Sequence, residues 1–288
     1  MKKVGINPNT DKDKNLQLTT KLIDFLAGLG AEIIVSKKLR PMLKDKRRLH
    51  YRSEPLLYDD LDLAVAIGGD GTILHMTRYT APRDIPIIGI NLGHLGYIAE
   101  LEAGEMDLIG RFFSGAYEIE ERMMLTASVI HGEQVEKVYH ALNDVVITKG
   151  ITAKLAELSL ESDRKRISSY RCDGVIFATP TGSTAYSLSA GGPIIEPRLE
   201  SILVTPICPH ALVSKSIVFS DRSDLVVRNR REDWDVYLSA DGDTIYPISK
   251  GNRVLITRSP YRTKLVKIKN MSFYEMLESK FSRGDEAR

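Results

Sequence analysis

The sequence has little cysteine and no long apolar run. Its two cysteines, Cys172 and Cys208, cannot build a disulfide framework and lack the spacing of a metal site. No stretch approaches the roughly 20 consecutive apolar residues that cross a membrane. Asn7 and Pro8 interrupt the first apolar run before it reaches the length of a signal peptide. These absences lead us to expect a cytoplasmic protein without a membrane anchor.

The chain also lacks a strong net charge. Its 288 residues include 40 basic and 38 acidic side chains, a formal net charge of +2. That balance gives no global electrostatic reason to expect a nucleic-acid or membrane partner. The length fits one large or two modest domains, so function must be sought in local motifs.

The pattern of apolar and polar residues changes near residue 122. Before it, short apolar runs alternate with helical patterns, which indicates a parallel sheet covered on both faces. After it, many short β-like runs are separated by turn residues, and Val254–Thr257 and Leu265–Ile268 are the last two. We therefore expect an α/β domain over 1–122, completed by a helical segment within 270–288, and a β-rich domain over 123–269.

A basic stretch, Lys37–Arg52, lies between the expected strands Glu32–Ser36 and Leu63–Ile67. Such a run is typical of a solvated loop. The alternative is a flap that brings cations to a phosphate-bearing ligand. Both interpretations stay open at this point.

The sharpest motif is Gly68-Gly69-Asp70-Gly71-Thr72, which follows the strand Leu63–Ile67 and opens a helical pattern. Glycines there let backbone N–H groups approach a phosphate, and a helix N-terminus favours anions. A carboxylate among them repels a phosphate unless it binds a metal or takes a proton, and both are phosphoryl-transfer roles. The alternative is a tight turn with a capping Asp. His75 either faces the phosphate or belongs to the helix surface or core.

Two further motifs are rich in polar groups. Thr179–Ser189 supplies many hydroxyl groups, and the ring of Tyr186 can stack on a flat base. The amide of Asn143 can read an adenine edge, and the carboxylate of Asp144 can accept from ribose hydroxyls. The alternatives are a polar loop for the first motif and a turn or helix cap for the second.

These motifs carry a family resemblance. Gly68–Thr72 resembles the motif shared by NAD kinases, lipid kinases and 6-phosphofructokinases. Asp173–Pro193 resembles the long signature of NAD kinases alone. Asn143-Asp144, Asn91–Tyr97 and Thr205–His210 are similar to further blocks of that family. The resemblance covers most of the chain.

The resemblance implies transfer of the γ-phosphate of ATP, or of polyphosphate, to the adenosine ribose 2′-hydroxyl of NAD, giving NADP. It implies an α/β domain, a β-rich domain and an active site in the cleft between them. Asp70 is the expected catalytic base, and Mg²⁺ is expected on the donor phosphates, with Asp70 as the only side chain considered for it. A homodimer or homotetramer is also implied. The alternatives are a lipid kinase and a non-catalytic NAD(P)-binding regulator.

The expected binding residues fall into two sets. Phosphate or nucleotide binding is assigned to Gly68, Gly69, Gly71, Thr72 and His75. NAD binding is assigned to Tyr97, Asn143, Asp144, Lys154, Arg171, Asp173, Thr184, Ala185, Tyr186, Ser187, Leu188, Ser189, Cys208 and Asp243.

Several of these positions have other interpretations. Lys154 fits a solvated strand lysine better than a ligand contact. Asp243 stands where the family has Gln or Glu, and its shorter side chain reaches less far. Arg171 and Asp173 match positions near the nicotinamide half and the subunit contact, or they form a surface ion pair. Cys208 would contact the ligand through its backbone or by shape.

Overall fold

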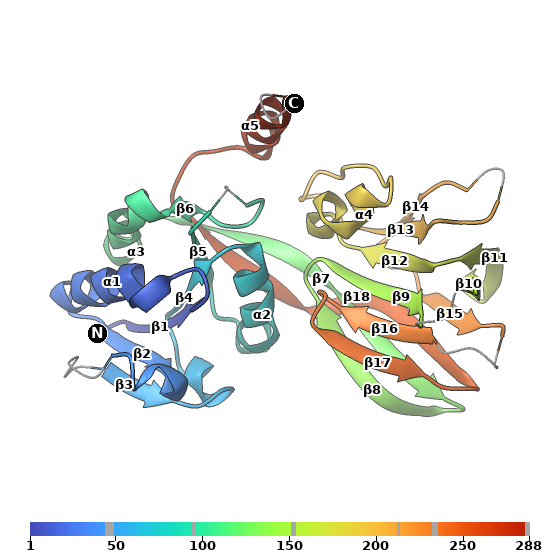
Figure 1. Ribbon diagram of the computed structural model, residues 1–288, viewed down its shortest axis with the longest axis horizontal. Helices are drawn as coiled ribbons and strands as arrows, with labels where there is room; N and C mark the ends of the chain where they lie inside the picture. The colour runs from blue at the N-terminus through green and yellow to red at the C-terminus, as the bar shows by residue number, and fades with distance from the viewer. Residues whose placement is uncertain (44–48, 94–95, 151–153, 212–213, 232–235, 286–288) are drawn as a thin grey trace. The chain divides into compact units, whose positions relative to one another are not determined.

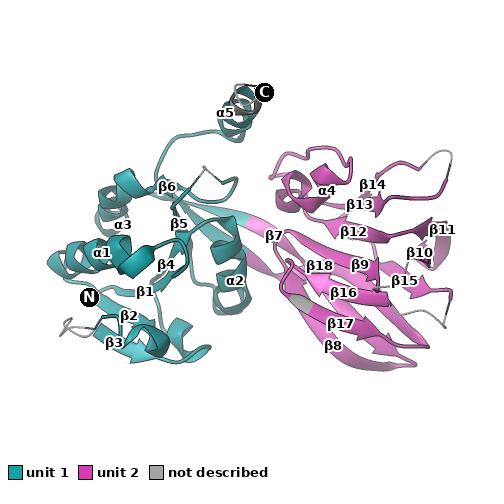
Figure 2. Ribbon diagram, in the orientation of Figure 1, with its two compact units in different colours: residues 1–121, 263–288 teal, residues 122–262 magenta. Residues whose placement is uncertain are grey.

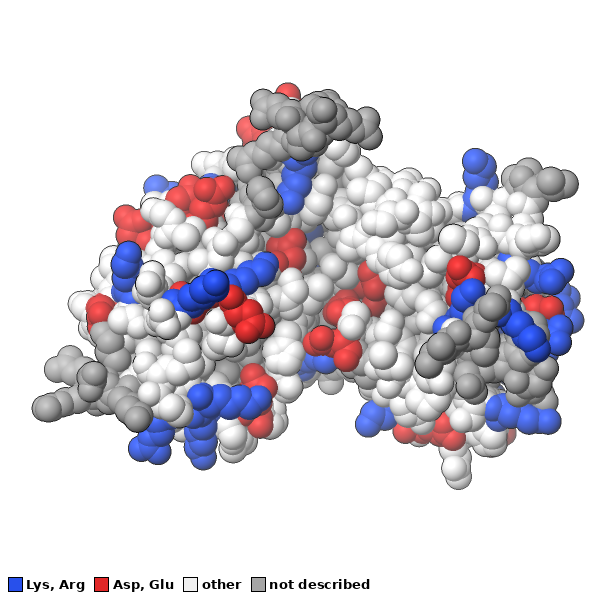
Figure 3. Space-filling model, viewed as in Figure 1, with Lys and Arg blue, Asp and Glu red and all other residues white. Residues whose placement is uncertain are grey.

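A computed structural model describes residues 1–43, 49–93, 96–150, 154–211, 214–231 and 236–285. The chain forms two compact units (Figure 2). Unit 1 is Met1–Glu121 with Thr263–Arg288, and unit 2 is Arg122–Arg262. On the face drawn in Figure 3, basic and acidic side chains are interspersed in both units, in keeping with the net charge of +2.

Unit 1 is built on a parallel sheet (Figure 1). In spatial order its strands are β3 (Leu49–Arg52), β2 (Glu32–Ser36), β1 (Lys3–Pro8), β4 (Leu63–Gly68), β5 (Ile87–Asn91) and the end of β18 (Asn252–Lys267), with short β6 (Leu101–Glu102) beside β5. The helices are α1 (Gln17–Gly28), α2 (Asp70–Thr80) and α3 (Gly110–Ser114), with the C-terminal α5 (Phe273–Asp285). The predicted α/β fold of this region is confirmed.

The core of unit 1 explains why these elements form. β4 and β5 are buried at every residue, as expected for parallel strands with both faces covered. α1 buries Leu22, Ile23 and Leu26 on one face. These residues join the strand side chains in one apolar cluster.

Unit 2 contains two sheets. One has the order β14 (Ile217–Ser220), β13 (Ser201–Ile207), β12 (Gly174–Ala178), β9 (Asp144–Lys149), β16 (Val236–Ala240), β17 (Thr244–Ile248). The other contains β11 (Lys165–Cys172), β10 (Ala156–Ser162), β15 (Leu225–Asn229), β18, β7 (Glu118–His131) and β8 (Gln134–Ala141). Side chains of both sheets, among them Phe177 and Leu158, share one core. The predicted β-rich region is confirmed.

The strand assignments from sequence need two corrections. Val254–Thr257 and Leu265–Ile268 are predicted as separate runs, but β18 is one strand through both. Pro260 indicates a break because it lacks an N–H donor. The strand continues because β15 pairs with its first half and β5 with Leu265.

The basic stretch 37–52 is also not a continuous loop. Leu49–Arg52 forms β3, which pairs in parallel with β2. Lys37–Leu39 forms a short 3-10 helix. Residues 44–48 lie outside the described residues.

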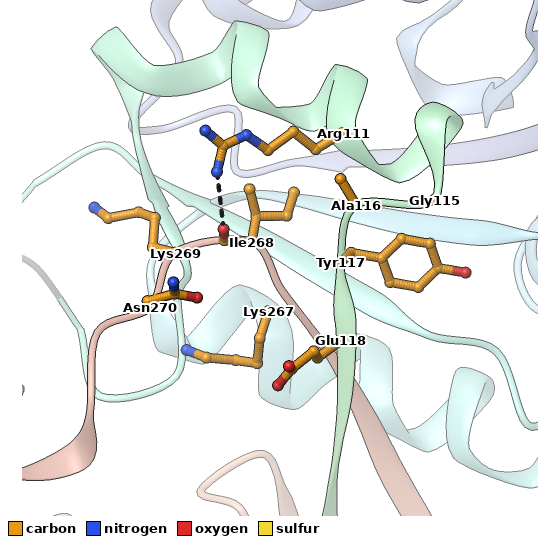
Figure 4. A pocket seen from close by; sticks show the side chains of 9 residues that line it. All are labelled: Arg111, Gly115, Ala116, Tyr117, Glu118, Lys267, Ile268, Lys269 and Asn270. Carbon is orange, nitrogen blue, oxygen red and sulfur yellow. Dashed lines mark hydrogen bonds between the residues drawn. The ribbon is translucent and has the colours of Figure 1, made fainter.

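Within unit 1, Glu100 anchors the C-terminal segment to the first part of the chain. Its carboxylate accepts the N–H groups of Ile268 at 2.8 Å and Lys269 at 2.6 Å and pairs with Lys267. Beside this segment lies a hollow of about 320 Å³ (Figure 4). Its lining includes Arg111, which donates to the Ile268 carbonyl at 3.2 Å. No residue assigned to ligand binding lines this hollow.

The predicted helix at Phe273–Phe281 is confirmed as α5. It begins with a capping box in which Ser272 and Glu275 exchange hydrogen bonds. None of the helices in the described ranges combines the length and the apolarity needed to cross a membrane.

Candidate active site

The glycine motif lies where the sequence predicts it, between β4 and α2. Gly68 ends the strand, Gly69 is the N-cap in extended backbone, and Asp70 begins the helix. A Cβ atom at Gly68 would collide with Thr72 Oγ1 and come within 2.9 Å of Asn9 Cβ. Glycine is therefore required at 68 by packing as well as by any phosphate.

Asp70 has a fixed orientation. Its Oδ2 accepts the N–H of Tyr97 at 2.7 Å, and its Oδ1 accepts those of Ile98 at 3.3 Å and Ala99 at 3.2 Å. Oδ2 thus keeps a lone pair that no backbone donor uses. The carboxylate is held still and retains the means to accept a proton or a cation.

Gly96 allows Asp70 to adopt this position. A Cβ atom at Gly96 would overlap the Asp70 carboxylate, whereas one at Gly93 in the same loop would meet nothing within 4 Å. We predict that Gly96→Ala lowers turnover by about 10²-fold, because a displacement of about 1 Å has that cost at a reacting group, the role that the sequence leads us to expect for Asp70. Gly93→Ala is the matched control and should keep its turnover. Equal turnover in the two variants would contradict this account.

Two predicted residues, Tyr97 and His75, lie near the motif. The Tyr97 ring lies under the Lys280 ammonium, which is 4.6 Å from the ring centroid, and burial followed by the Asp70 charge raises the pKa of Tyr97. His75 lies on α2 with its Nε2 atom 3.8 Å from Glu54 Oε1 and packs edge-on against Tyr79.

In unit 2, Asn143 and Asp144 lie at the start of β9 and are held by Asp241. The Asp241 carboxylate accepts the N–H groups of Leu142 and Asn143 at 2.8 Å and of Asp144 at 3.1 Å. The sequence indicates a turn at Asp241-Gly242 but assigns no site role to Asp241. In the turn that joins β16 to β17, Asp241 and Gly242 both have left-handed φ.

This arrangement leaves two groups suited to a ligand. Asn143 Oδ1 is buried and has no hydrogen-bond partner among the described residues. Burial and then the nearby Asp241 charge raise the pKa of Asp144 to about 7. A buried acceptor without a donor is costly, so Asn143 Oδ1 favours a ligand that donates a hydrogen bond. A donor would also stabilise the charged form of Asp144.

The hydroxyl-rich segment packs beneath Asn143. Thr179 Oγ1 donates to the Leu142 carbonyl at 2.6 Å, and a Cβ atom at Gly182 would collide with the Asn143 backbone. Ser183 donates to the Pro180 carbonyl at 2.6 Å. Several hydroxyls predicted to be available to a ligand therefore hold the segment itself.

The residues assigned to NAD in this segment differ in exposure. Ser187 is fully buried and shares a 2.8 Å hydrogen bond with Thr205, whereas Tyr186 is 45% exposed. Thr184 donates to the Thr181 carbonyl at 3.1 Å. Ala185 and Leu188 are half-buried, and Ser189 is exposed. Only the exposed and half-buried members can offer their side chains without rearrangement.

Arg171 and Asp173 do not pair with each other. Arg171 Nε lies 3.8 Å from Glu157 Oε1, and Asp173 is bonded to Lys149 at 2.6 Å. Cys172 between them is buried, and burial raises the pKa of its thiol to about 12. That thiol is a packed group and no nucleophile.

The last three predicted contacts, Lys154, Cys208 and Asp243, are exposed. Cys208 has a left-handed backbone, with φ 44°. Asp243 follows the turn whose Asp241 contacts the Asn143 segment.

No metal cluster is preformed in the described part of the chain. There, no group of three or more His, Cys, Asp or Glu side chains is placed to hold an ion. Asp70 Oδ2 is an oxygen of the kind that Mg²⁺ prefers. A metal bound with a polyphosphate would need only such a single carboxylate.

Comparison with known proteins identifies this architecture. Residues 4–114 match the family described as the ATP-NAD kinase N-terminal domain, and residues 142–268 match the ATP-NAD kinase C-terminal domain. The two units and the glycine motif thus define a two-domain phosphotransferase.

Relatives over the whole length narrow the assignment. The chain is 40% identical to an NAD kinase of Caldanaerobacter subterraneus subsp. tengcongensis over 283 residues, covering 98% of this chain and 99% of the relative. It is 44% identical to an NAD kinase of Carboxydothermus hydrogenoformans over 228 residues, covering 79% and 81%. The chain belongs to the NAD kinase family. The lipid kinase and the non-catalytic regulator are not favoured.

Two solved kinase structures have a fold similar to that of this chain. Yeast NADH kinase complexed with NADH superposes with a TM-score of 0.87 at 25% identity, covering 96% of this chain and 86% of that one. An NAD kinase from Archaeoglobus fulgidus in complex with ATP superposes with a TM-score of 0.76 at 25% identity, covering 97% and 98%.

Proposed function

We propose that the NAD kinase reaction of this chain uses Asp70 as the general base. The observation that carries the proposal is the Asp70 carboxylate, fixed by three backbone N–H groups directly after the glycine turn. Asp70 Oδ2 takes the proton of the adenosine ribose 2′-hydroxyl as that oxygen attacks the γ-phosphorus of ATP. The bond from phosphorus to the β-phosphate oxygen breaks, and the products are NADP and ADP.

The glycine turn binds the donor. Gly68, Gly69 and Gly71 bring backbone close to the phosphates at the N-terminus of α2, where an anion is favoured. Thr72 and His75 belong to the same helix and are proposed to border this nucleotide site.

Unit 2 holds the acceptor. Asn143 Oδ1 accepts from the adenine amino group, and Asp144 accepts from ribose hydroxyls. Tyr186 stacks on a flat ring of the dinucleotide. The remaining contacts are proposed at Tyr97, Lys154, Arg171, Asp173, Thr184, Ala185, Ser187, Leu188, Ser189, Cys208 and Asp243.

We propose that Mg²⁺ binds this site together with the phosphates of the donor. The phosphates and water would supply its ligands. Asp70 is the one side chain proposed beside the ion, and it would contact the ion through water because Oδ2 has to accept the proton. When bound, the ion offsets charge on the phosphates.

The substrates are supported by related structures. The yeast relative was solved with NADH and the archaeal relative with ATP. We propose NAD as the acceptor and ATP as the donor, with polyphosphate as the competing donor. We further propose that unit 1 is the nucleotide-binding domain expected at 1–122 with 270–288, and unit 2 the NAD-binding domain expected at 123–269. A cytoplasmic homodimer or homotetramer completes the proposal.

A substrate matrix tests the proposed pair. The purified protein is incubated with Mg²⁺ and either ATP or polyphosphate, and with either NAD or NADH, and the 2′-phosphorylated product is measured. We expect product with ATP and NAD. Product formation with polyphosphate alone would overturn the assigned donor, and formation from NADH alone would overturn the assigned acceptor.

A further inference from the structure

A lysine from a distant part of the sequence reaches the glycine turn. Lys12 lies in the loop between β1 and α1. A Cβ atom at Gly69 would lie 3.2 Å from Lys12 Nζ and 3.8 Å from Asn91 Oδ1. The ammonium therefore lies over Gly69, in space that any side chain at that position would take.

The loop that carries Lys12 is fixed to the motif. Asn9 donates its N–H to the Ile67 carbonyl at the end of β4, at 2.7 Å. Asn9 Oδ1 accepts the N–H groups of Asp11 at 3.0 Å and Lys12 at 3.1 Å. Asp13 caps α1 through Leu18 and Thr19. Asn9 is thus bonded to the residue before the glycine turn, and its side chain holds the backbone of Lys12.

No carboxylate in the described ranges neutralises the Lys12 ammonium beside Gly69. The ammonium forms no ion pair with any residue in the described ranges, whereas Lys149, Lys264, Lys267 and Lys269 all pair with carboxylates. Two carboxylates flank Lys12 in the loop, Asp11 and Asp13, and Asp13 accepts from backbone N–H groups of α1.

The positive charge of Lys12 can offset the negative charges that meet at the glycine motif. Asp70 and a polyphosphate repel each other, and the glycine motif itself carries no basic residue. A lysine ammonium is a compact charge suited to phosphate oxygens. Resting on the function proposed above, we propose that Lys12 binds the terminal phosphates of ATP and stabilises the charge on the transferred group.

The test compares Lys12→Met, Lys12→Arg and the control Lys14→Met, an exposed lysine two residues away in the same region. Lys12→Met should lower kcat/KM for ATP by about 10- to 100-fold, the range for losing a hydrogen bond to a charged group. The KM for NAD should stay within about twofold, and Lys12→Arg should keep more activity than Lys12→Met. Lys14→Met should match the wild type.

A binding measurement separates this inference from the proposed function. Calorimetry with a non-hydrolysable ATP analogue should show weaker binding to Lys12→Met, with an unchanged Kd for NAD. If Lys12→Met keeps kcat/KM for ATP within twofold, or loses NAD and ATP affinity equally, the inference is wrong. If the wild type and Lys14→Met make no NADP, the proposed function fails, and analogue binding still decides the role of Lys12.

Discussion

Asp70→Asn should lower the turnover of NAD to NADP by about 10²- to 10⁴-fold, the usual contribution of a general base. An amide cannot take the 2′-hydroxyl proton at neutral pH. NAD binding should persist, because the groups proposed to bind NAD lie mainly in unit 2. Steady-state rates and an NAD titration measure the two effects separately.

Loss of structure must be distinguished from loss of the base. Asp70 also anchors the backbone of Tyr97, Ile98 and Ala99. The melting temperature and the NAD affinity of Asp70→Asn should therefore be measured together with its turnover rate. A folded variant that retained most of its turnover would remove Asp70 from the catalytic role.

Asp144→Asn should weaken the use of NAD and stabilise the protein. The amide loses the anionic acceptor proposed for the ribose hydroxyls, so kcat/KM for NAD should fall by about 10²-fold. Asp144 is only 6% exposed and lies beside Asp241. Replacing this buried charge should raise the melting temperature at pH 8 by several degrees.

The stability effect has a definite pH dependence. The pKa of Asp144 is about 7 in the folded protein and about 4 in an unfolded chain. The folded state therefore binds more protons between pH 4 and 7, and stability falls as pH rises through that window. The stabilisation by Asp144→Asn should thus be small at pH 4 and complete above pH 7. The exposed residue Asp224 supplies the control, Asp224→Asn, which should show no such trend.

The kinetic profile provides a second readout of the same group. For the wild type, kcat/KM for NAD should rise with pH through an apparent pKa near 7, because this ratio reports the free enzyme. Asp144→Asn should lack that rise. An unchanged rise in the variant would assign the titration to another group.

Much of this architecture follows from local sequence. The runs that become β4 and β5 are apolar throughout, so burial on both faces can be predicted. The glycine motif between β4 and α2 is equally local. The change in sequence pattern near residue 122 separates the α/β region from the β-rich region.

What the sequence could not show depends on contacts between distant residues. Asp241 and Asn143 are 98 positions apart and meet only because β16 pairs with β9. Lys12 reaches Gly69 because β1 pairs with β4. Ser187 looks available as a hydroxyl, yet its bond to Thr205 forms only when the segment folds onto β13.

Transfer of a labelled phosphate tests the central claim most directly. The wild type and Asp70→Asn are incubated with NAD, Mg²⁺ and ATP labelled at the γ-phosphate, and the position of the label is determined. The account predicts label on the 2′-oxygen of the adenosine ribose with the wild type and almost none with a folded, NAD-binding Asp70→Asn. Label at that oxygen at similar rates with both proteins would contradict it.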